Sequence, residues 1–357
     1  MRLGCKIILV LFIFIIIGLI VYFVEHSSTS DDVSPSGIDQ GSRGIDQDGG
    51  QDTDTDTSKL AYTVTVSQSG NGDFTTIQDA VNSIHTKSRK HKQWIRILVQ
   101  PGVYNEQVQI PQDKSCILLQ GHGPRHTTIT YNAHDETDTS PTVKILADNV
   151  VVKGITFENS YITKIKGQNV QIFSPAVATM VSGDKIAFYK CAFKGYQDTL
   201  WDQQGRHYFK NCHIEGAVDF IWGNGQSFYE GCSINAIDGG FITAQGRASP
   251  NDPSGYVFNN CKVNGDAQTY LGRAYGPNSR VIFVNSMLDR VVQPQGWNIW
   301  RQQGHEGDIV YAEVNCNGPG ANSPLRVPWR KNLNGVDMAQ YTLTSFVDQD
   351  GWISKQP

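Results

Sequence analysis

The clearest pattern along the chain is a short unit in which apolar and polar residues alternate around a cysteine. Four segments share it, and two more carry Ile155 and Ser286 in the cysteine column: FYKCAFKG (188–195), FKNCHIEG (209–216), YEGCSINA (229–236), FNNCKVNG (258–265), VKGITFEN (152–159) and FVNSMLDR (283–290). A period of two residues is typical of a β-strand. The pattern therefore predicts six equivalent strands, with Asn or Gly recurring at their turns.

The spacing of these strands favours a solenoid. Successive members of this column are 36, 21, 20, 29 and 25 residues apart in the sequence. A unit of this length cannot bury its apolar face alone, so units must stack. A β-sandwich with coincidental cysteines is the alternative, but regular hairpin signals are missing. We predict an all-β fold, a right-handed parallel β-helix, in which the segment DFTTIQDAVNSIH (73–85) forms an N-terminal capping helix because its apolar residues have helical spacing.

The same repeat predicts that Cys191, Cys212, Cys232 and Cys261 form one inward column. Cys212 and Cys232 lie on adjacent coils and are the pair best placed for a disulfide, which needs Cα atoms ~4.4–6.8 Å apart. The cysteines show no close-pair spacing of the kind that zinc sites use.

The N-terminal part of the chain has a different composition. Ile7 to Val24 is an apolar run of 18 residues without a charge, long enough to span a membrane, and Arg2 and Lys6 should keep its N-terminal end in the cytosol. We expect residues 1–26 to be a cleaved signal peptide or an uncleaved signal anchor, residues 27–59 a disordered acidic tether, and residues 60–357 the folded domain, secreted or anchored outside the cell. The net charge of −4 falls mainly on the tether, so the nearly neutral body gives no reason to expect nucleic acid.

Two aspartates follow the cysteine spacing. Asp198 and Asp219 are 21 residues apart, and each comes seven residues after a cysteine of the column. Because stacked strands are ~4.8 Å apart, the two carboxyls should lie ~5–8 Å from each other, with Gly239 on the next coil leaving room beside Asp219. Two close carboxylates cannot both ionise cheaply, so such a pair divides into an acid and a base or nucleophile. Two unrelated surface aspartates are the alternative, but flanking aromatic residues favour a functional pair.

The neighbours of the pair suggest roles without naming the reaction. Gln197 could donate its amide to an oxyanion, and Arg273 could pair with Asp219 and keep it ionised. A retaining glycosidase also uses two carboxyls ~5–5.5 Å apart, and an ester hydrolase could use one as nucleophile and one as acid. Both reactions stay open at this point.

Seven segments in order make the chain resemble the plant pectinesterase (pectin methylesterase) family, from about Val64 to Trp352. They are PGVYNE (101–106), GYQDTL (195–200), VDFIWG (218–223), ITAQGR (242–247), YLGRAYG (270–276), NCNGPGA (315–321) and RVPW (326–329). The resemblance implies a right-handed parallel β-helix that hydrolyses the methyl esters of pectin without cofactor or metal. It also implies methyl-esterified pectin as the binding partner, a proteinaceous pectinesterase inhibitor as a candidate partner, and a monomer. The lineage would be the one without an N-terminal inhibitor-like domain.

Carried over position by position, the resemblance makes Asp219 the nucleophile, Asp198 the proton donor and later base, Gln197 an oxyanion donor and Arg273 the partner of the nucleophile. These roles agree with those inferred from the residues themselves.

Three positions depart from the family pattern. Pro175 stands where a second oxyanion-side glutamine is usual, Tyr275 where a substrate-stacking tryptophan is usual, and Trp222 where a phenylalanine is usual. Proline offers neither a side-chain amide nor a backbone N–H. With Tyr196, these three residues form the expected substrate-binding set.

Other functions are kept as alternatives. A non-catalytic or weakly active pectin-binding β-helix would keep the fold but need not keep both aspartates. A polygalacturonase-like glycosidase would share fold and substrate, but only its GHG element (121–123) is found here. A pectate lyase would need a calcium cluster that cannot be assembled from the sequence.

The N-terminal interpretation is tested by fusing residues 1–59 to a reporter. We expect the fusion to enter the secretory pathway, because the apolar run is long enough to be recognised as a signal or an anchor. Cell fractionation and microscopy would locate it, and a reporter left in the cytosol would contradict the interpretation.

Overall fold

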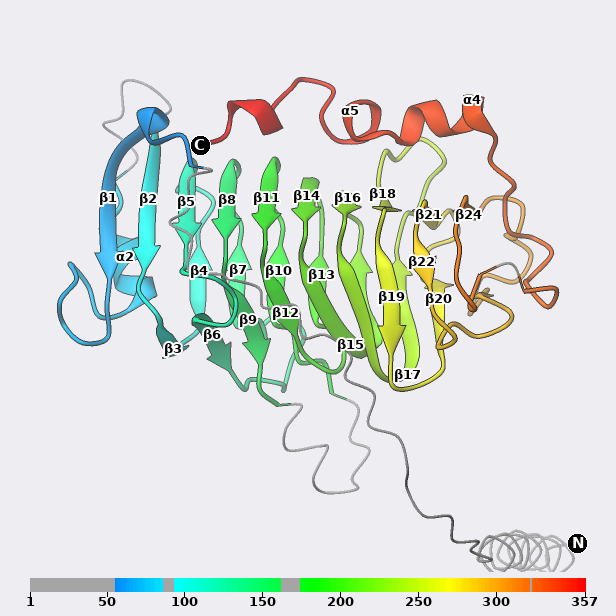
Figure 1. Cartoon of the computed structure of the whole chain (residues 1–357), viewed down its shortest axis with the longest axis horizontal. Helices are drawn as coiled ribbons and strands as arrows, with labels where there is room; N and C mark the ends of the chain where they lie inside the picture. The colour runs from blue at the N-terminus through cyan, green and yellow to red at the C-terminus, as the bar shows by residue number, and fades with distance from the viewer. Residues whose placement is uncertain (1–54, 86–92, 162–173, 322) are drawn as a thin grey trace, which may run out of the picture. The chain divides into compact units, whose positions relative to one another are not determined.

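The computed structural model describes residues 55–85, 93–161, 174–321 and 323–357, and these residues are dominated by parallel strands. Strands from successive coils lie side by side along the solenoid in Figure 1, from β1 to β24. Every strand pairing among the described residues that joins two named strands is parallel, for example β14 with β16. The architecture is therefore a parallel β-helix, as the repeat predicts.

One face of the solenoid is a sheet of ten strands. Its members, in spatial order, are β1 (Leu60–Val66), β2 (Trp94–Val99), β5 (Ile117–Gln120), β8 (Val150–Lys153), β11 (Ile186–Tyr189), β14 (Arg206–Lys210), β16 (Gln226–Glu230), β18 (Gly255–Asn259), β21 (Arg280–Val284) and β24 (Val310–Val314).

The other strands form a sheet of fourteen, to which most coils contribute two short strands. They are β3 (Gly102–Asn105), β4 (Val108–Ile110), β6 (Thr127–Tyr131), β7 (Val143–Ile145), β9 (Thr156–Asn159), β10 (Thr179–Val181), β12 (Ala192–Lys194), β13 (Leu200–Asp202), β15 (His213–Gly223), β17 (Ser233–Gln245), β19 (Lys262–Gly265), β20 (Thr269–Ala274), β22 (Met287–Leu288) and β23 (Trp297–Asn298). The long strands β15 and β17 run through both short-strand positions and join them into one sheet.

The core is a set of columns that run along the solenoid. The aromatic column is continuous from Phe188 through Phe209, Tyr229 and Phe258 to Phe283, with consecutive ring centroids 4.5–4.9 Å apart and planes within 13° of parallel. All five rings are buried. Each coil thus buries its aromatic side chain only against its neighbours, which is why the units must stack.

The predicted cysteine column is confirmed by the strand register. Ala192 pairs with His213, His213 with Ser233, and Ser233 with Lys262, so the cysteines that precede these residues are also level with one another. The residue before each cysteine has a left-handed backbone, with φ between 51° and 63° at Lys190, Asn211, Gly231 and Asn260. Glycine and asparagine tolerate this conformation best, which explains their recurrence at the turns.

The predicted disulfide is wrong. Cys212 and Cys232 are both free thiols, buried on adjacent coils. Each sulfur instead faces a main-chain carbonyl of the preceding coil, Cys212 Sγ with Phe188 O at 3.5 Å and Cys232 Sγ with Phe209 O at 3.5 Å. Burial, followed by hydrogen bonds with the thiols of Cys191 and Cys232, raises the pKa of Cys212, so neighbouring thiols of the column interact while remaining free.

The predicted capping helix is confirmed as α2 (Ile77–Ser83), whose N-cap Thr76 accepts a hydrogen bond from the Asp79 amide. Its residues Ile77, Ala80 and Val81 are buried in the main core cluster. A helix across the first coil protects an end that would otherwise expose the column of apolar side chains.

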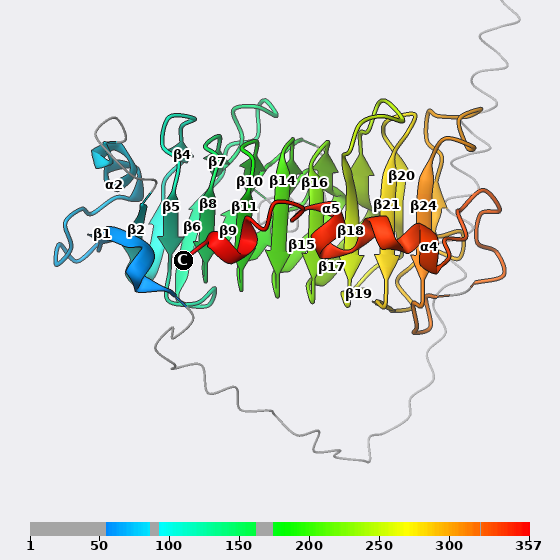
Figure 2. The same ribbon diagram turned by 90° about the horizontal axis from the view of Figure 1, so that it is seen from above.

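The C-terminal segment runs back along the ten-stranded sheet, as Figures 1 and 2 show. Its short helices are α4 (Gly335–Met338), η2 (Ala339–Tyr341), α5 (Leu343–Phe346) and η3 (Ile353–Lys355). Tyr341, Phe346, Val347 and Trp352 pack on the outward side chains of this sheet, which include Tyr208 and Phe228. The segment therefore covers apolar residues that the solenoid leaves on the outside of its sheet.

The start of the folded body lies slightly before the predicted boundary. Residues 55–59 belong to the expected disordered tether, yet Thr57–Lys59 form a 3-10 helix capped by Asp56, and Lys59 Nζ donates to Gln356 O at 2.6 Å. These contacts to the C-terminal segment hold the last tether residues in place. The expected helix at residues 7–24 and the remaining tether lie outside the described residues. Within the described residues, no helix has the length and apolar character needed to cross a membrane.

Candidate active site

The two predicted aspartates occupy the same position on adjacent coils. Gln197 is bridged to Val218, and the amide of Asp198 donates to the carbonyl of Val218 at 3.0 Å. The register continues as Leu200 with Ile221, so Asp198 is level with Asp219. Both aspartates have a left-handed backbone, with φ of 61° at Asp198 and 52° at Asp219. Residues other than glycine rarely adopt this conformation, although it also recurs at the turns of this solenoid, for example at Asn211.

Asp219 is held by Arg273, as predicted. Arg273 Nε donates to Asp219 Oδ1 at 2.7 Å, and Nη2 donates to the other oxygen, so the pair is bidentate. Arg273 lies on β20, and Asp219 lies on β15. The exposed fraction is only 6% for Asp219 and 9% for Arg273. A bidentate guanidinium fixes both the charge and the orientation of a carboxylate.

The two carboxyls differ in their electrostatic environment. Burial, followed by the negative charge of Asp219, raises the pKa of Asp198 to about 7, against a smaller lowering by Gln197 and Arg273. Burial also raises the pKa of Asp219, but the hydrogen bonds and charge of Arg273 oppose that rise. Asp198 is therefore the group that keeps a proton near neutral pH, and Asp219 is the group with a cation to stabilise its charge.

Aromatic rings surround the guanidinium of Arg273. Its Cζ lies 4.1 Å from the ring centroid of Trp300, 5.3 Å from that of Tyr275 and 5.5 Å from that of Phe241. Stacked rings hold an arginine side chain while leaving its N–H groups free to donate. Tyr275 is an expected site residue and is 53% exposed. Sequence reasoning missed two site residues, Trp300 and Phe241, because neither lies in a repeat segment or in a family motif.

The expectation for Gly239 is wrong. β17 carries extra residues relative to β15, so Gly216 pairs with Ala236 but Val218 pairs with Phe241. This shift moves Gly239 out of line with Asp219 and brings Phe241 to the level of the site. A register irregularity of this kind re-aims side chains locally and cannot be read from the cysteine spacing.

The other predicted site residues lie on the coils beside the pair. The carbonyl of Gln197 accepts from the Ala176 amide at 3.2 Å, which places Pro175 on the coil that precedes Gln197. Tyr196 donates its hydroxyl to Asp238 Oδ2 at 2.7 Å.

Trp222 stacks on Trp201 with ring centroids 4.6 Å apart, at positions paired between β13 and β15. This stack follows the aspartates by the same number of residues on each coil, so it extends the site along the two strands.

Three buried polar atoms of the site have no hydrogen-bond partner among the described residues. They are Gln197 Oε1, Arg273 Nη1 and Trp222 Nε1. Buried polar atoms are nearly always paired, so a group of unpaired ones beside two carboxyls indicates a surface that contacts a polar ligand. No cluster of three or more His, Cys, Asp or Glu side chains that could hold a metal occurs in the described part of the chain.

Comparison with known proteins identifies relatives of the same architecture. The pectinesterase family model matches residues 63–350. The probable pectinesterase 29 of Arabidopsis thaliana is 47% identical over 302 residues, which is 82% of this chain and 89% of that protein. Pectinesterase 31 of the same plant is 36% identical, covering 80% of this chain and 92% of that protein.

Two solved structures extend the comparison to the fold. Pectin methylesterase from carrot matches with a TM-score of 0.75 and 30% identity, over 82% of this chain and 95% of that one. The Aspergillus niger enzyme matches with a TM-score of 0.71 and 28% identity, over 83% and 96%. These likenesses confirm the predicted right-handed parallel β-helix.

The coupling between the carboxyls is tested by replacing Asp219 with asparagine. Because the charge of Asp219 raises the pKa of Asp198, Asp219→Asn should lower that pKa from about 7 toward the ordinary value of an aspartate. Carboxyl ¹³C NMR titration would measure it. Asp238→Asn is the control, because the exposed Asp238 contacts Tyr196 and not the pair. An unchanged titration of Asp198 in Asp219→Asn would contradict the coupling.

Proposed function

The chain belongs to the pectinesterase family and is a carboxylic ester hydrolase that removes methyl esters from pectin, and from that premise we propose how its residues divide the reaction. Asp219 is the nucleophile, Asp198 is the general acid and then the general base, Gln197 donates to the oxyanion, and Arg273 holds the nucleophile. The observation that carries this assignment is that only Asp219 has the guanidinium as a hydrogen-bond partner, while Asp198 beside it keeps its proton near neutral pH.

In the first half-reaction, a carboxylate oxygen of Asp219 attacks the C6 carbonyl carbon of a methyl galacturonate unit. The carbonyl oxygen becomes an oxyanion, which the Gln197 amide stabilises. The intermediate collapses by breaking the bond to the methoxy oxygen, and Asp198 gives that oxygen its proton, so methanol leaves. An anhydride between Asp219 and the substrate remains, and Asp198 is now a carboxylate.

In the second half-reaction, the Asp198 carboxylate takes a proton from a water molecule that attacks the C6 carbon. The bond to Asp219 breaks, which releases the free galacturonate carboxyl and restores both aspartates to their starting states. Arg273 again has a full carboxylate to pair with, so its bidentate contact favours the leaving of Asp219.

Aromatic side chains near the pair are suited to bind the sugar rings. Tyr275 and Trp300 are exposed and lie beside the Arg273 guanidinium, Trp222 lies on β15 with Asp219, and Tyr196 comes two residues before Asp198. Sugar C–H faces pack well on aromatic rings, and the exposed tyrosine offers less stacking area than a tryptophan would. We assign Tyr275 a weaker hold on the polymer than a tryptophan would give at this position.

The cellular setting of the reaction is also part of the proposal. The apolar run at residues 7–24 supports export, so the catalytic domain would act in the cell wall, secreted or anchored. We propose that the domain acts as a monomer, and a proteinaceous pectinesterase inhibitor is a further partner to test.

The nucleophile assignment is tested by assaying methanol, reducing ends and unsaturated product from one esterified pectin. We expect the unchanged protein to release methanol alone, because an ester bond and no glycosidic bond is broken. Asp219→Asn should abolish methanol release, since an amide is a poor nucleophile, and Asp198→Asn should slow both half-reactions. Asp238→Asn is the matched control for loss of a carboxylate near the site. Full methanol release by Asp219→Asn would contradict the assignment.

The oxyanion assignment is tested at two positions on adjacent coils. Gln197→Ala should lower kcat by about 10²–10³-fold, the usual cost of removing a main oxyanion donor. Pro175 supplies no amide, so Gln197 has no second glutamine to share its role, and Pro175→Gln should raise kcat or leave it unchanged. Steady-state methanol release measures both. A Gln197→Ala variant with kcat near that of the unchanged protein would show that the oxyanion is stabilised elsewhere.

A further inference from the structure

A polar cluster lies inside the solenoid, where neighbouring columns are apolar or aromatic. Its members are Asp202 on β13, His207 on β14 and Tyr229 on β16, and all three side chains are fully buried. His207 Nδ1 lies 2.6 Å from Asp202 Oδ1, and the Tyr229 hydroxyl donates to Asp202 Oδ2 at 2.7 Å. The carboxyl group of Asp202 therefore has a partner on each oxygen, both supplied by the opposite sheet.

The directions of these hydrogen bonds follow from their partners. His207 Nε2 lies 2.8 Å from the carbonyl of Gly183, which can only accept, so Nε2 carries a proton. Burial, followed by the charge of Asp202, raises the pKa of Tyr229 well above its ordinary value, so its hydroxyl remains a donor. The cluster thus ties three successive coils together, from Gly183 through Asp202 and His207 to Tyr229.

Stability alone does not account for the cluster. Removing a carboxylate from water is costly, and well-packed apolar side chains of similar size are often as stabilising as a buried polar pair. Fully satisfied networks of this kind do, however, hold a single arrangement of the chain. Asp202 is therefore expected to hold a particular arrangement of the strands around it.

Asp202 links β13, the strand that follows Asp198, to the chain that follows β15, the strand that carries Asp219. It ends β13, four residues after Asp198, and Gly223 ends β15, four residues after Asp219. The Gly225 amide donates to the carbonyl of Asp202 at 2.9 Å. A Cβ at Gly225 would lie 1.9 Å from Asp202 Oδ1, so the chain after β15 is packed directly against this carboxyl group.

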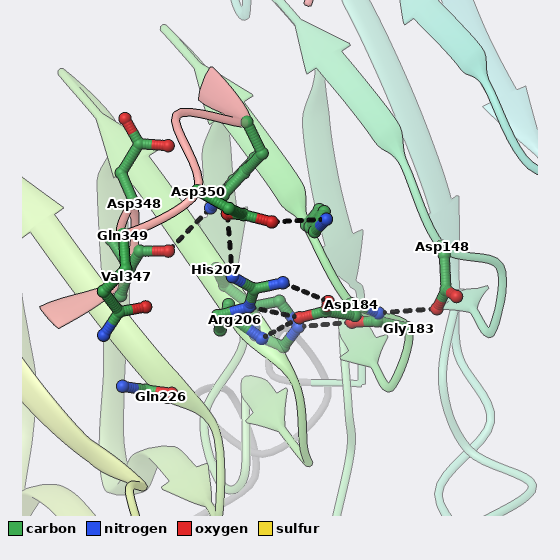
Figure 3. A network of polar contacts seen from close by, with 12 residues as sticks. Asp148, Gly183, Asp184, Arg206, His207, Gln226, Val347, Asp348, Gln349 and Asp350 are labelled. Carbon is green, nitrogen blue, oxygen red and sulfur yellow. Dashed lines mark hydrogen bonds and ion pairs between the residues drawn. The ribbon is translucent and has the colours of Figure 1, made fainter. Parts of the chain in front are cut away.

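The strand that supplies His207 is also held from outside. Arg206 precedes His207, and its Nε donates to Asp184 Oδ1 at 2.9 Å while Nη1 donates to Asp350 Oδ1 at 2.9 Å. Figure 3 shows Arg206 between these two carboxylates, with His207 directed toward Gly183. The C-terminal segment therefore fixes the outer face of β14 while Asp202 fixes its inner face.

We propose that Asp202, held by His207 and Tyr229, is a positioning residue that fixes β13 against β15 and thereby sets the separation of Asp198 and Asp219. This inference rests on the catalytic roles proposed above for those two aspartates. Asp202 itself touches no reacting atom, because it is buried inside the solenoid.

The proposal predicts a kinetic change with a definite sign. Burial, followed by the charge of Asp219 on β15, raises the pKa of Asp198, whereas the adjacent Gln197 and Arg273 on β20 lower it. If β13 and β15 are less firmly held, Asp219 acts more weakly on Asp198, and the pKa of Asp198 falls. Since Asp198 must be protonated to release methanol, the alkaline limb of the kcat/KM profile should move to lower pH.

The test compares Asp202→Asn and Tyr229→Phe with the unchanged protein, using methanol release from esterified pectin. Asp202→Asn should lower kcat by about 10- to 10²-fold, the scale of a small misplacement of catalytic groups, with KM changed by less than about 2-fold. Tyr229→Phe removes one donor and keeps the ring in its column, so its effects should have the same signs and be smaller. The alkaline limb should move to lower pH in both variants.

Tyr104→Phe is the matched control, because like Tyr229→Phe it removes a buried tyrosine hydroxyl. The Tyr104 hydroxyl donates to the main-chain carbonyl of Gln100 at 2.9 Å, on the coil of β3 and outside the cluster. It should lower the Tm without changing kcat or the pH profile. If Tyr229→Phe behaves in the same way, the cluster is only structural and the proposal is overturned, even if Asp202→Asn fails to fold. Methanol release by Asp219→Asn would instead refute the catalytic roles, so the two failures are distinguishable.

Discussion

The constraint on which the structure depends is the hydrogen-bonded register between adjacent coils. Parallel pairing places residues at equivalent positions of adjacent coils ~4.8 Å apart, so a side chain that recurs at the same position of each coil lies against its counterpart. In the core this produces the aromatic column of Phe209 and Tyr229. On the outside it brings Asp198 level with Asp219, because the coil between them is 21 residues long. Core and site are both consequences of this strand register rather than of a fixed repeat length, because the rings of Tyr229 and Phe258 stay stacked across 29 residues.

The site buries ionisable groups and contains left-handed backbone, and both cost free energy of folding that the surrounding coils must offset. Two carboxyls and a guanidinium are largely removed from water, and both aspartates have a left-handed backbone. Arg273 offsets part of this cost for Asp219, but Asp198 has no equivalent cation and instead retains its proton. The asymmetry of the pair therefore depends on where one arginine lies. Arg273 is positioned by β20 and by the rings of Trp300 and Phe241, so these rings help to determine which aspartate is paired with the guanidinium.

Sequence reasoning could reach the features that depend on the repeat, and it failed where local geometry breaks the repeat. The strand columns, the capping helix and the level of Asp198 with Asp219 all follow from periodicity. Gly239 was misplaced because β17 has extra residues that no spacing reveals. The disulfide was wrong because adjacency along a column brings two thiols together without joining them, and both remain free. Trp300 comes from a later coil, so only the three-dimensional path brings it to Arg273.

Pro175 stands where the family resemblance implies a second glutamine, and this changes what the remaining polar groups must do. Proline has no N–H, so the coil before Gln197 offers no donor at this position. Gln197 Oε1 and Arg273 Nη1 are buried without partners among the described residues, and each lies beside a different aspartate of the pair. An unpaired acceptor suits a hydroxyl group, and an unpaired cationic donor suits a carbonyl or carboxylate oxygen. A polymer of galacturonate units carries both kinds of group around each ester, so we propose that these atoms bind the sugar while the Gln197 amide donates to the oxyanion.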